Sequence, residues 1–133
     1  MERHAFNAEQ RWQEVDGFVQ ACEVRGGRRT LYCSGQLSVD PDGKPLCVGD
    51  MPGQIAAAFD NLENVLKQAG FRMADIVRLN IFTTDIDLCL QNYGTVINRL
   101  KDNDCLPACT LVGVTRLAWP ETLVEIEAIA EAD

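Results

Sequence analysis

The segment Thr122-Leu-Val-Glu-Ile-Glu-Ala-Ile-Ala130 decides the fold, because it alternates like a strand and carries apolar side chains on both faces. One face consists of Val124, Ile126, Ala128 and Ala130, and the other of Leu123, Glu125, Glu127 and Ile129. The first face suits contact with helices. The second mixes carboxylates with aliphatic side chains, which is unusual for a face turned to solvent. We therefore expect a subunit interface there, burying roughly 1,000 Å² or more if the contact is stable.

A helix is expected upstream, beginning after Asp50 and ending at Gly70. Asp50 is a good N-cap, Pro52 fits the first turn, and glycine favours the position just past a helix end. Between these signals, apolar side chains recur at helical spacing: Ile55, Phe59, Leu62, Leu66 and Ala69. A single apolar stripe indicates that one side of this helix is buried.

A second helix is expected from residue 85 or 87 to about residue 100. Asp85 and Asp87 are both possible caps. Its inner side would consist of Leu90, Tyr93, Ile97 and Leu100. Gly94 falls inside this helix and weakens it by about 1 kcal/mol relative to alanine.

Strands are expected over residues 18–24, 30–34, 75–83, 108–115 and 122–130. Arg25-Gly-Gly-Arg28 suits a tight hairpin between the first two, and Asp40-Pro-Asp-Gly-Lys44 suits a further turn. Residues 1–16 show no pattern and are expected to be irregular. The order of elements predicts one domain over residues 1–133. Its fold class is α/β, with a single mixed sheet and two helices packed on one face.

The composition narrows the function. The chain has 133 residues, of which 47% are hydrophobic, and its net charge is −8. Nucleic-acid binders normally present a basic face, so we expect no nucleic-acid partner. No apolar run is long enough to span a membrane, and the polar start differs from a signal peptide. We expect a cytoplasmic protein with no membrane partner, whose six cysteines are free thiols.

The residues of several common catalytic and metal sites are missing. His4 is the only histidine and lies in the segment expected to be irregular, which leaves a Ser–His–Asp or Cys–His site without a positioned base. The cysteine spacing does not suit zinc, and no glycine pair precedes the Lys-Ser/Thr of a phosphate loop. We expect neither a metal nor a cofactor. Arg25, Arg28 and Arg29 are interpreted as a solvated hairpin tip.

Five segments occur in the order found in the reactive-intermediate deaminase family (RidA, formerly YjgF), which the chain resembles from about residue 18 to residue 130. They are Cys33-Ser-Gly-Gln-Leu-Ser-Val-Asp40, Ala58-Phe-Asp-Asn-Leu62, Asp75-Ile-Val-Arg-Leu-Asn-Ile-Phe-Thr83, Pro107-Ala108 and Val124-Glu-Ile-Glu-Ala-Ile-Ala130. The resemblance implies a chorismate-mutase-like α/β subunit that forms a homotrimer. The sheets would build a central barrel, with small-molecule ligands in clefts between subunits.

The resemblance also implies an activity. Catalytic members of the family hydrolyse enamine or imine intermediates, such as 2-aminoacrylate, to a 2-keto acid and ammonia. In these members an arginine directly after Pro-Ala anchors the substrate carboxylate through a bidentate contact. Here that position is Cys109, and a neutral thiol cannot hold a carboxylate. Losing this ion pair is expected to cost about a hundredfold or more in rate.

Other positions of the family pattern are kept more closely. The carboxylate that helps to hold the water is kept as Glu125. Phe18 stands at the family's aromatic position but lacks a phenol hydroxyl, and Tyr93 falls near a ligand-contacting position of the second helix. The resemblance therefore gives Glu125 and Cys109 as catalytic candidates. It gives Phe18, Ser34, Gly35, Tyr93, Thr110 and Arg116 as ligand-binding candidates.

Each of these residues also has a purely structural interpretation. Cys109 suits inert packing, since a reactive thiol needs an electropositive setting. Glu125 suits an interface salt bridge as well as contact with a ligand, and Arg116 suits structural pairing as well as replacement of the missing anchor. Phe18 and Tyr93 suit core or interface packing.

Two functions of different classes therefore stay open. The first is a hydrolytic imine or enamine deaminase, acting on a non-standard substrate because of Cys109. The second is a non-catalytic trimeric module that binds a small ligand or a protein in the same cleft. Ribonuclease activity, associated with some relatives of the family, is a distant third because the chain is acidic and has a single histidine.

Overall fold

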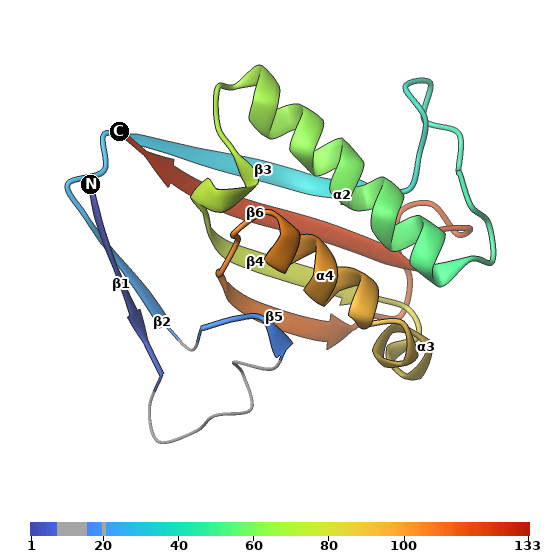
Figure 1. Cartoon of the computed structure of the whole chain (residues 1–133). Helices are drawn as coiled ribbons and strands as arrows, with labels where there is room; N and C mark the ends of the chain where they lie inside the picture. The colour runs from blue at the N-terminus through green and yellow to red at the C-terminus, as the bar shows by residue number, and fades with distance from the viewer. Residues whose placement is uncertain (8–15, 20) are drawn as a thin grey trace.

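The structure is a computed structural model that describes residues 1–7, 16–19 and 21–133 (Figure 1). The strands are β1 (Glu2–Phe6), β2 (Ala21–Arg25), β3 (Arg29–Leu37), β4 (Ile76–Thr83), β5 (Ala108–Gly113) and β6 (Val124–Ala132). The helices are α2 (Met51–Gln68), α3 (Ile86–Gln91) and α4 (Gly94–Asp102), with a short 3-10 helix, η1 (Met73–Asp75). In this part of the chain no helix has the length and apolar character needed to cross a membrane.

Four strands form the main sheet in the order β3-β6-β4-β5. β6 is antiparallel to both β3 and β4, whereas β4 and β5 are parallel. α2 and α4 lie side by side over one face of this sheet (Figure 1). The predicted mixed α/β fold with its helices on one face is confirmed.

The N-terminal region differs from the prediction. Glu2–Phe6, expected to be irregular, form β1, which pairs antiparallel with β2 in a separate two-stranded sheet. The main sheet is therefore accompanied by a second one. Residues 8–15 of the segment expected to be irregular lie outside the described residues.

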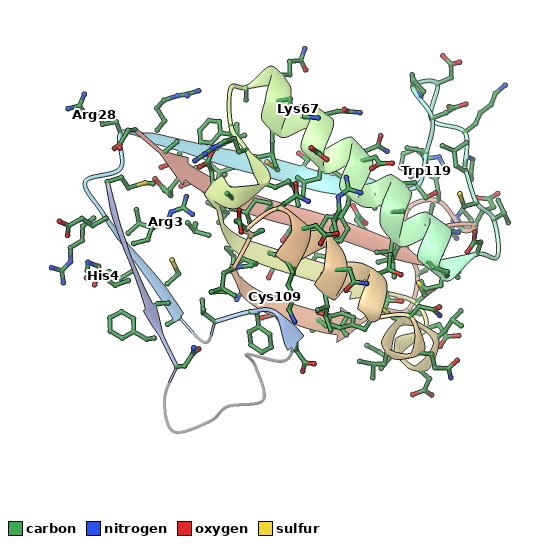
Figure 2. The ribbon with its side chains drawn as sticks, in the orientation of Figure 1. Arg3, His4, Arg28, Lys67, Cys109 and Trp119 are labelled. Carbon is green, nitrogen blue, oxygen red and sulfur yellow. The ribbon has the colours of Figure 1, made fainter. Side chains whose placement is uncertain are left out.

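The predicted hairpin between residues 18–24 and 30–34 is wrong. Gly26 has the positive φ of 72° that a turn requires, but β2 pairs with β1 and β3 pairs with β6. Contacts distant in sequence hold this arrangement, because the Arg3 guanidinium donates to the carbonyls of Asp75 (2.9 Å) and Glu131 (2.8 Å). Arg28 is exposed in the connection between the two sheets (Figure 2).

The helix predicted after Asp50 is confirmed as α2. The Asp50 carboxylate accepts a hydrogen bond from the Gly53 N–H (3.0 Å), and Gly70, with φ of 77°, ends the helix. Its buried stripe contains Ile55, Phe59, Leu62 and Leu66. Each large apolar side chain buried in this way stabilises the fold by about 1.5–3 kcal/mol.

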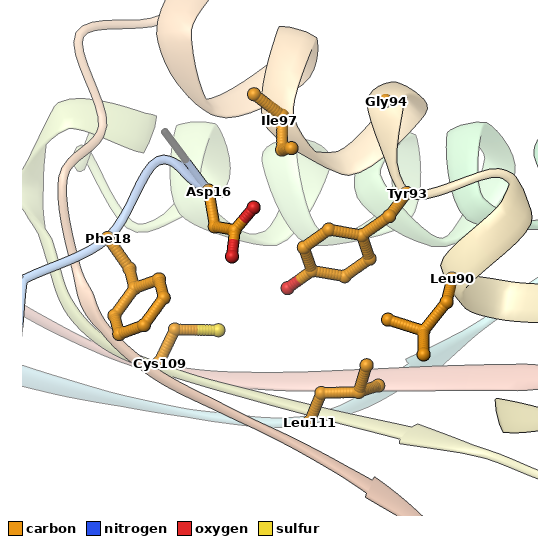
Figure 3. A pocket seen from close by; sticks show the side chains of 8 residues that line it. All are labelled: Asp16, Phe18, Leu90, Tyr93, Gly94, Ile97, Cys109 and Leu111. Carbon is orange, nitrogen blue, oxygen red and sulfur yellow. The ribbon is translucent and has the colours of Figure 1, made fainter. Parts of the chain in front are cut away.

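The second predicted helix is two helices. α3 is capped by Asp85, whose carboxylate accepts from the Leu88 N–H (3.0 Å), and α4 starts at Gly94. Between them the Asn92 side chain donates to the Leu88 carbonyl (2.9 Å), and glycine at residue 94 disfavours a continuous helix. Leu90, predicted to face inward, is 54% exposed. Tyr93 sits at the break, which directs its side chain toward the sheet (Figure 3).

The alternation predicted for the last strand is confirmed in β6. Val124, Ile126, Ala128 and Ala130 are buried beneath the helices, whereas Glu125 and Glu127 are half-buried on the other face. We call this second face of the main sheet the outer face. In the single chain it also presents Tyr32, which is 75% exposed, and Val112, which is 39% exposed.

Candidate functional site

A cavity of about 470 Å³ lies between α4, the end of α3, β5 and the residues that precede β2. We call it the helix-side cavity. Its lining residues are Asp16, Phe18, Leu90, Tyr93, Gly94, Ile97, Cys109 and Leu111 (Figure 3). Three residues predicted for the site, Phe18, Tyr93 and Cys109, meet here. Of the lining residues that the structure describes, Asp16 alone has a charged side chain.

The register of β5 turns Cys109 toward the helices. Cys109 pairs with Leu79 of β4, and Leu111 pairs with Ile81. Leu79 and Ile81 are fully buried, and residues in register on adjacent strands share a face of the sheet. Cys109 and Leu111 therefore form the floor of the helix-side cavity.

The segment before β2 is held beside this floor by the main chain. The Val19 N–H donates to the Pro107 carbonyl (3.0 Å), and Val19 forms an isolated parallel bridge with Ala108. This contact places Phe18 one residue from the bridge and next to Cys109 (Figure 3).

The Tyr93 hydroxyl points toward the sulfur of Cys109 and is placed to donate a hydrogen bond to it (Figure 3). Burial raises the pKa of the Cys109 thiol, although this hydrogen bond and the charge of Arg78 lower it in part. Burial also raises the pKa of Tyr93, and Cys109 raises it further. Both groups are uncharged at neutral pH, so Cys109 is a thiol there rather than a nucleophilic thiolate.

Glu125 lies on the outer face, away from the helix-side cavity. Burial raises the pKa of the Glu125 carboxyl, and the negative charge of Glu127 raises it further. Glu127 accepts a hydrogen bond from the Asn80 side chain (3.0 Å), but no basic side chain in the described residues pairs with Glu125. A carboxyl with a raised pKa and no fixed cation is suited to taking up and releasing a proton.

Gly35 lies directly against Glu125. The pairing of β3 with β6 shifts register between Cys33 and Gln36, and Gly35 falls within this irregularity. A Cβ atom at residue 35 would collide with Oε1 and Cδ of Glu125. Ser34 is exposed beside them, and its carbonyl accepts from the Gln36 side chain (3.1 Å). The structure thus brings together a second group of predicted residues, the outer-face group of Ser34, Gly35 and Glu125.

The last two predicted residues lie elsewhere. Thr110 is on the outer face, where its hydroxyl accepts a hydrogen bond from Arg78 (2.6 Å). Arg116 is exposed in the connection between β5 and β6 and does not line the helix-side cavity. Within one copy it therefore does not replace the missing arginine in that cavity.

Among the lining residues that were not predicted for the site, Leu111 and Asp16 were missed for different reasons. Leu111 follows Cys109 by two positions, and a strand period of two places both on one face, so this signal was present in the sequence. Asp16 carries no such signal, because it comes from a segment without periodicity.

The histidine lies away from this site, and the described residues contain no cluster of metal ligands. His4 lies on β1 against Glu2 (3.4 Å), well apart from Cys109 (Figure 2). Over residues 1–7, 16–19 and 21–133, no three His, Cys, Asp or Glu side chains form a group that could hold a metal ion. All six cysteines are free thiols.

Comparison with known proteins gives a consistent result. The profile of the family described as Endoribonuclease L-PSP matches residues 8–132. A RutC family protein of Sulfurisphaera tokodaii is 32% identical over 115 residues, covering 86% of this chain and 87% of that protein. The 2-iminobutanoate/2-iminopropanoate deaminase of Rattus norvegicus is 34% identical over 104 residues, which cover 77% of this chain and 72% of that protein. The crystal structure of YyfB, a Rid family protein of unknown function from Yersinia pestis, superposes with a TM-score of 0.86 at 32% identity, covering 98% and 99%.

Proposed function

Because the chain belongs to the RidA family, we propose that it hydrolyses reactive enamine or imine intermediates in a cleft shared between copies of the chain. The name of the rat relative, a 2-iminobutanoate/2-iminopropanoate deaminase, supports the reaction class. The substrate is a non-standard one, because a neutral thiol at Cys109 takes the position of the carboxylate anchor.

One observation carries the proposal of a shared cleft. The predicted site residues divide between the helix-side cavity and the outer-face group, which lie on opposite faces of one sheet. A second copy is needed to bring Glu125 to a neighbour's cavity. The outer face suits such contact, because it combines exposed Tyr32 and Val112 with half-buried carboxylates. We propose a homotrimer of about 44 kDa, three times the 14.7 kDa chain.

The chemistry proposed for this cleft follows from the protonation states. Glu125 orients a water molecule and takes its proton as the oxygen attacks the imine carbon. A C–O bond forms, and Glu125 passes the proton to the nitrogen, which gives a carbinolamine. The hydroxyl proton then passes to the nitrogen by the same carboxylate as the C–N bond breaks, and the products are a carbonyl compound and ammonia. The raised pKa of Glu125 suits it to both proton transfers. Tyr93 and Cys109 stay neutral and shape the cavity rather than attack the substrate.

A non-catalytic binding module is the second candidate function. The neutral Cys109 favours it, as does the lack of a basic side chain among the described lining residues, because the carboxylate anchor of the known reaction is missing there. Nucleic acid is not proposed as a partner, despite the nuclease in the family description, because the chain carries a net charge of −8.

The test is ammonia release, or trapping of the imine by semicarbazide, with imines generated in the assay by an amino-acid or amine oxidase. The set includes 2-iminopropanoate and imines without a carboxylate. We expect Glu125→Gln to lower the rate by about 10²–10⁴-fold, while exposed Glu121→Gln, a matched control, leaves it unchanged. If wild-type protein does not exceed the spontaneous rate with any imine, the binding module is the correct assignment.

A further inference from the structure

We propose that the helix-side cavity binds a cationic organic group without a carboxylate, an ammonium or a protonated imine, and that Asp16 selects it. Binding of the cation is independent of the proposed function. Its assignment as a substrate rests on that function. Asp16 is thus a specificity residue that takes the opposite charge to the arginine found in catalytic relatives.

The charge of the cavity points to this ligand class. Asp16 directs its carboxylate into the space between Phe18 and Tyr93 (Figure 3). Within the described residues this carboxylate has no hydrogen bond and no ion pair. Among the residues that the structure describes, the remaining lining is aromatic, aliphatic or neutral, with no lysine, arginine or histidine. A carboxylate in such surroundings attracts a cation and repels a carboxylate ligand.

The aromatic side chains reinforce the same preference. Phe18 and Tyr93 stand on the two sides of the Asp16 carboxylate (Figure 3). The faces of aromatic rings attract organic cations, and the attraction grows when the cation is removed from water. The cavity volume of about 470 Å³ falls in the usual range for small-molecule sites. A primary amine or imine with a compact apolar body fits this combination.

A protonated imine in this cavity would react as the proposed function requires. Water adds to the carbon of the C=NH₂⁺ group, the C–N bond breaks, and the products are an aldehyde or ketone and ammonium, so that atoms and charge balance. Asp16 stabilises the positive charge of the bound imine. Its role is to position the substrate, and the proton transfers stay with Glu125.

Three probes of similar size and shape that differ in charge test the charge preference of the cavity. They are benzylammonium, benzyl alcohol and benzoate, titrated by calorimetry into the full-length chain at neutral pH. We expect benzylammonium to bind most tightly and benzoate most weakly. Asp16→Asn should weaken the binding of benzylammonium by about tenfold. Asp42→Asn, the same change at an exposed turn outside the cavity, should leave this affinity unaltered.

Cys109→Arg gives a second variant that keeps the test decisive if Asp16→Asn folds poorly. It should reverse the order and favour benzoate. Benzoate binding to wild type as tightly as benzylammonium would overturn the proposal, as would an Asp16→Asn variant that is folded and binds benzylammonium unchanged.

Assays with imines distinguish the two proposals from each other. If wild type hydrolyses 2-iminopropanoate rapidly and Asp16→Asn does so at the same rate, the proposed cation preference is contradicted and the proposed hydrolase activity is supported. If benzylammonium binds in a way that depends on Asp16 but no imine is hydrolysed, the proposed cation site is supported and the proposed hydrolase activity is contradicted.

Discussion

Cys109 and Glu125 point to opposite faces of the same sheet. Cys109 is in register with Leu79, which is in register with Ala128, and both partners are buried beneath the helices. Glu125 is three residues from Ala128, so strand alternation turns it the other way. The two catalytic candidates are therefore fixed by one rigid sheet and cannot meet in a single copy. If both residues act in one reaction, the proposed site must be formed by two copies of the chain.

Cys109→Arg is expected to give activity toward imines that carry a carboxylate. The guanidinium would enter the helix-side cavity and supply the bidentate anchor that the thiol lacks. The rate of ammonia release from 2-iminopropanoate should rise about tenfold or more. Asp16 lines the same cavity and competes with the substrate carboxylate for the new arginine. The Asp16→Asn, Cys109→Arg double variant should therefore release ammonia faster than Cys109→Arg alone. Equal rates for wild type and both variants would contradict the anchor argument.

Gly35→Ala should disrupt the outer-face group. The added methyl would collide with the Glu125 carboxylate, which must move or strain β3. We expect a loss of about 1–3 kcal/mol in the free energy of unfolding, measured by urea denaturation. Gly94→Ala is the matched control, because nothing lies within 4 Å of a Cβ placed there. A Gly35→Ala variant as stable as Gly94→Ala would show that Glu125 does not pack against the chain as described.

The pH dependence of stability should reveal the state of Glu125. Burial raises its pKa above the ordinary value of 4.5, so the folded chain binds this proton more tightly than the unfolded chain. The contribution of Glu125 to stability is fully present below pH 4.5 and is lost as pH rises through the raised pKa. Glu125→Gln should therefore be more stable than wild type at pH 7, with the difference vanishing near pH 4. Thermal unfolding from pH 4 to 8 measures this, with Glu121→Gln as the exposed control.

Alkylation by iodoacetamide should distinguish the two kinds of cysteine in the chain. Cys47 is exposed and should react first, whereas burial raises the pKa of Cys109 and keeps it a thiol. Tyr93→Phe removes the hydrogen bond that lowers the pKa of Cys109, so the pH midpoint of its labelling should move upward. Peptide mass spectrometry over a pH series gives both results. A labelling midpoint for Cys109 below pH 7 would identify a reactive thiolate instead.

The sequence predicted best those elements whose signals are local. Capping by Asp50, the apolar stripe of α2 and the alternation of β6 each come from neighbouring residues, and each was correct. The pairing of β1 with β2 was missed, because it depends on Arg3 contacting carbonyls about 70 and 130 residues away. The break before Gly94 was underestimated, although it is what turns Tyr93 into the cavity.

The candidate site was predicted as a set of residues but not as a geometry. Family resemblance selects Phe18, Tyr93 and Cys109, and the structure places these three in one cavity. It could not show that Cys109 faces the helices, away from Glu125, because the register of β5 against β4 is not encoded in either strand alone. Asp16 escaped prediction because its place in the cavity depends on the Val19–Pro107 contact.

A mixing experiment tests directly whether the proposed site is shared between copies. Ile97→Trp fills the helix-side cavity, and Glu125→Gln removes the outer-face carboxylate, so trimers of either variant alone should be inactive. In trimers assembled from equal amounts of both, a site is intact when its cavity comes from the Glu125→Gln copy and its carboxylate from the Ile97→Trp copy. Random assembly gives this combination in about one quarter of sites, and ammonia release should recover to that level.

The matched control mixes wild type with the double variant Ile97→Trp, Glu125→Gln in equal amounts. If the site is shared, it needs an intact cavity from one copy and an intact Glu125 from another, which predicts about one quarter of wild-type activity. If the site lies inside one copy, about one half is expected. Sedimentation of the mixtures verifies that trimers form. Recovery near one half in the control, with none in the first mixture, would mean that each copy works alone. In that event Glu125 would act on the site of its own copy, against the opposed directions of Cys109 and Glu125 in this structure. About half of wild-type activity in the first mixture would instead exclude Glu125 from the reaction.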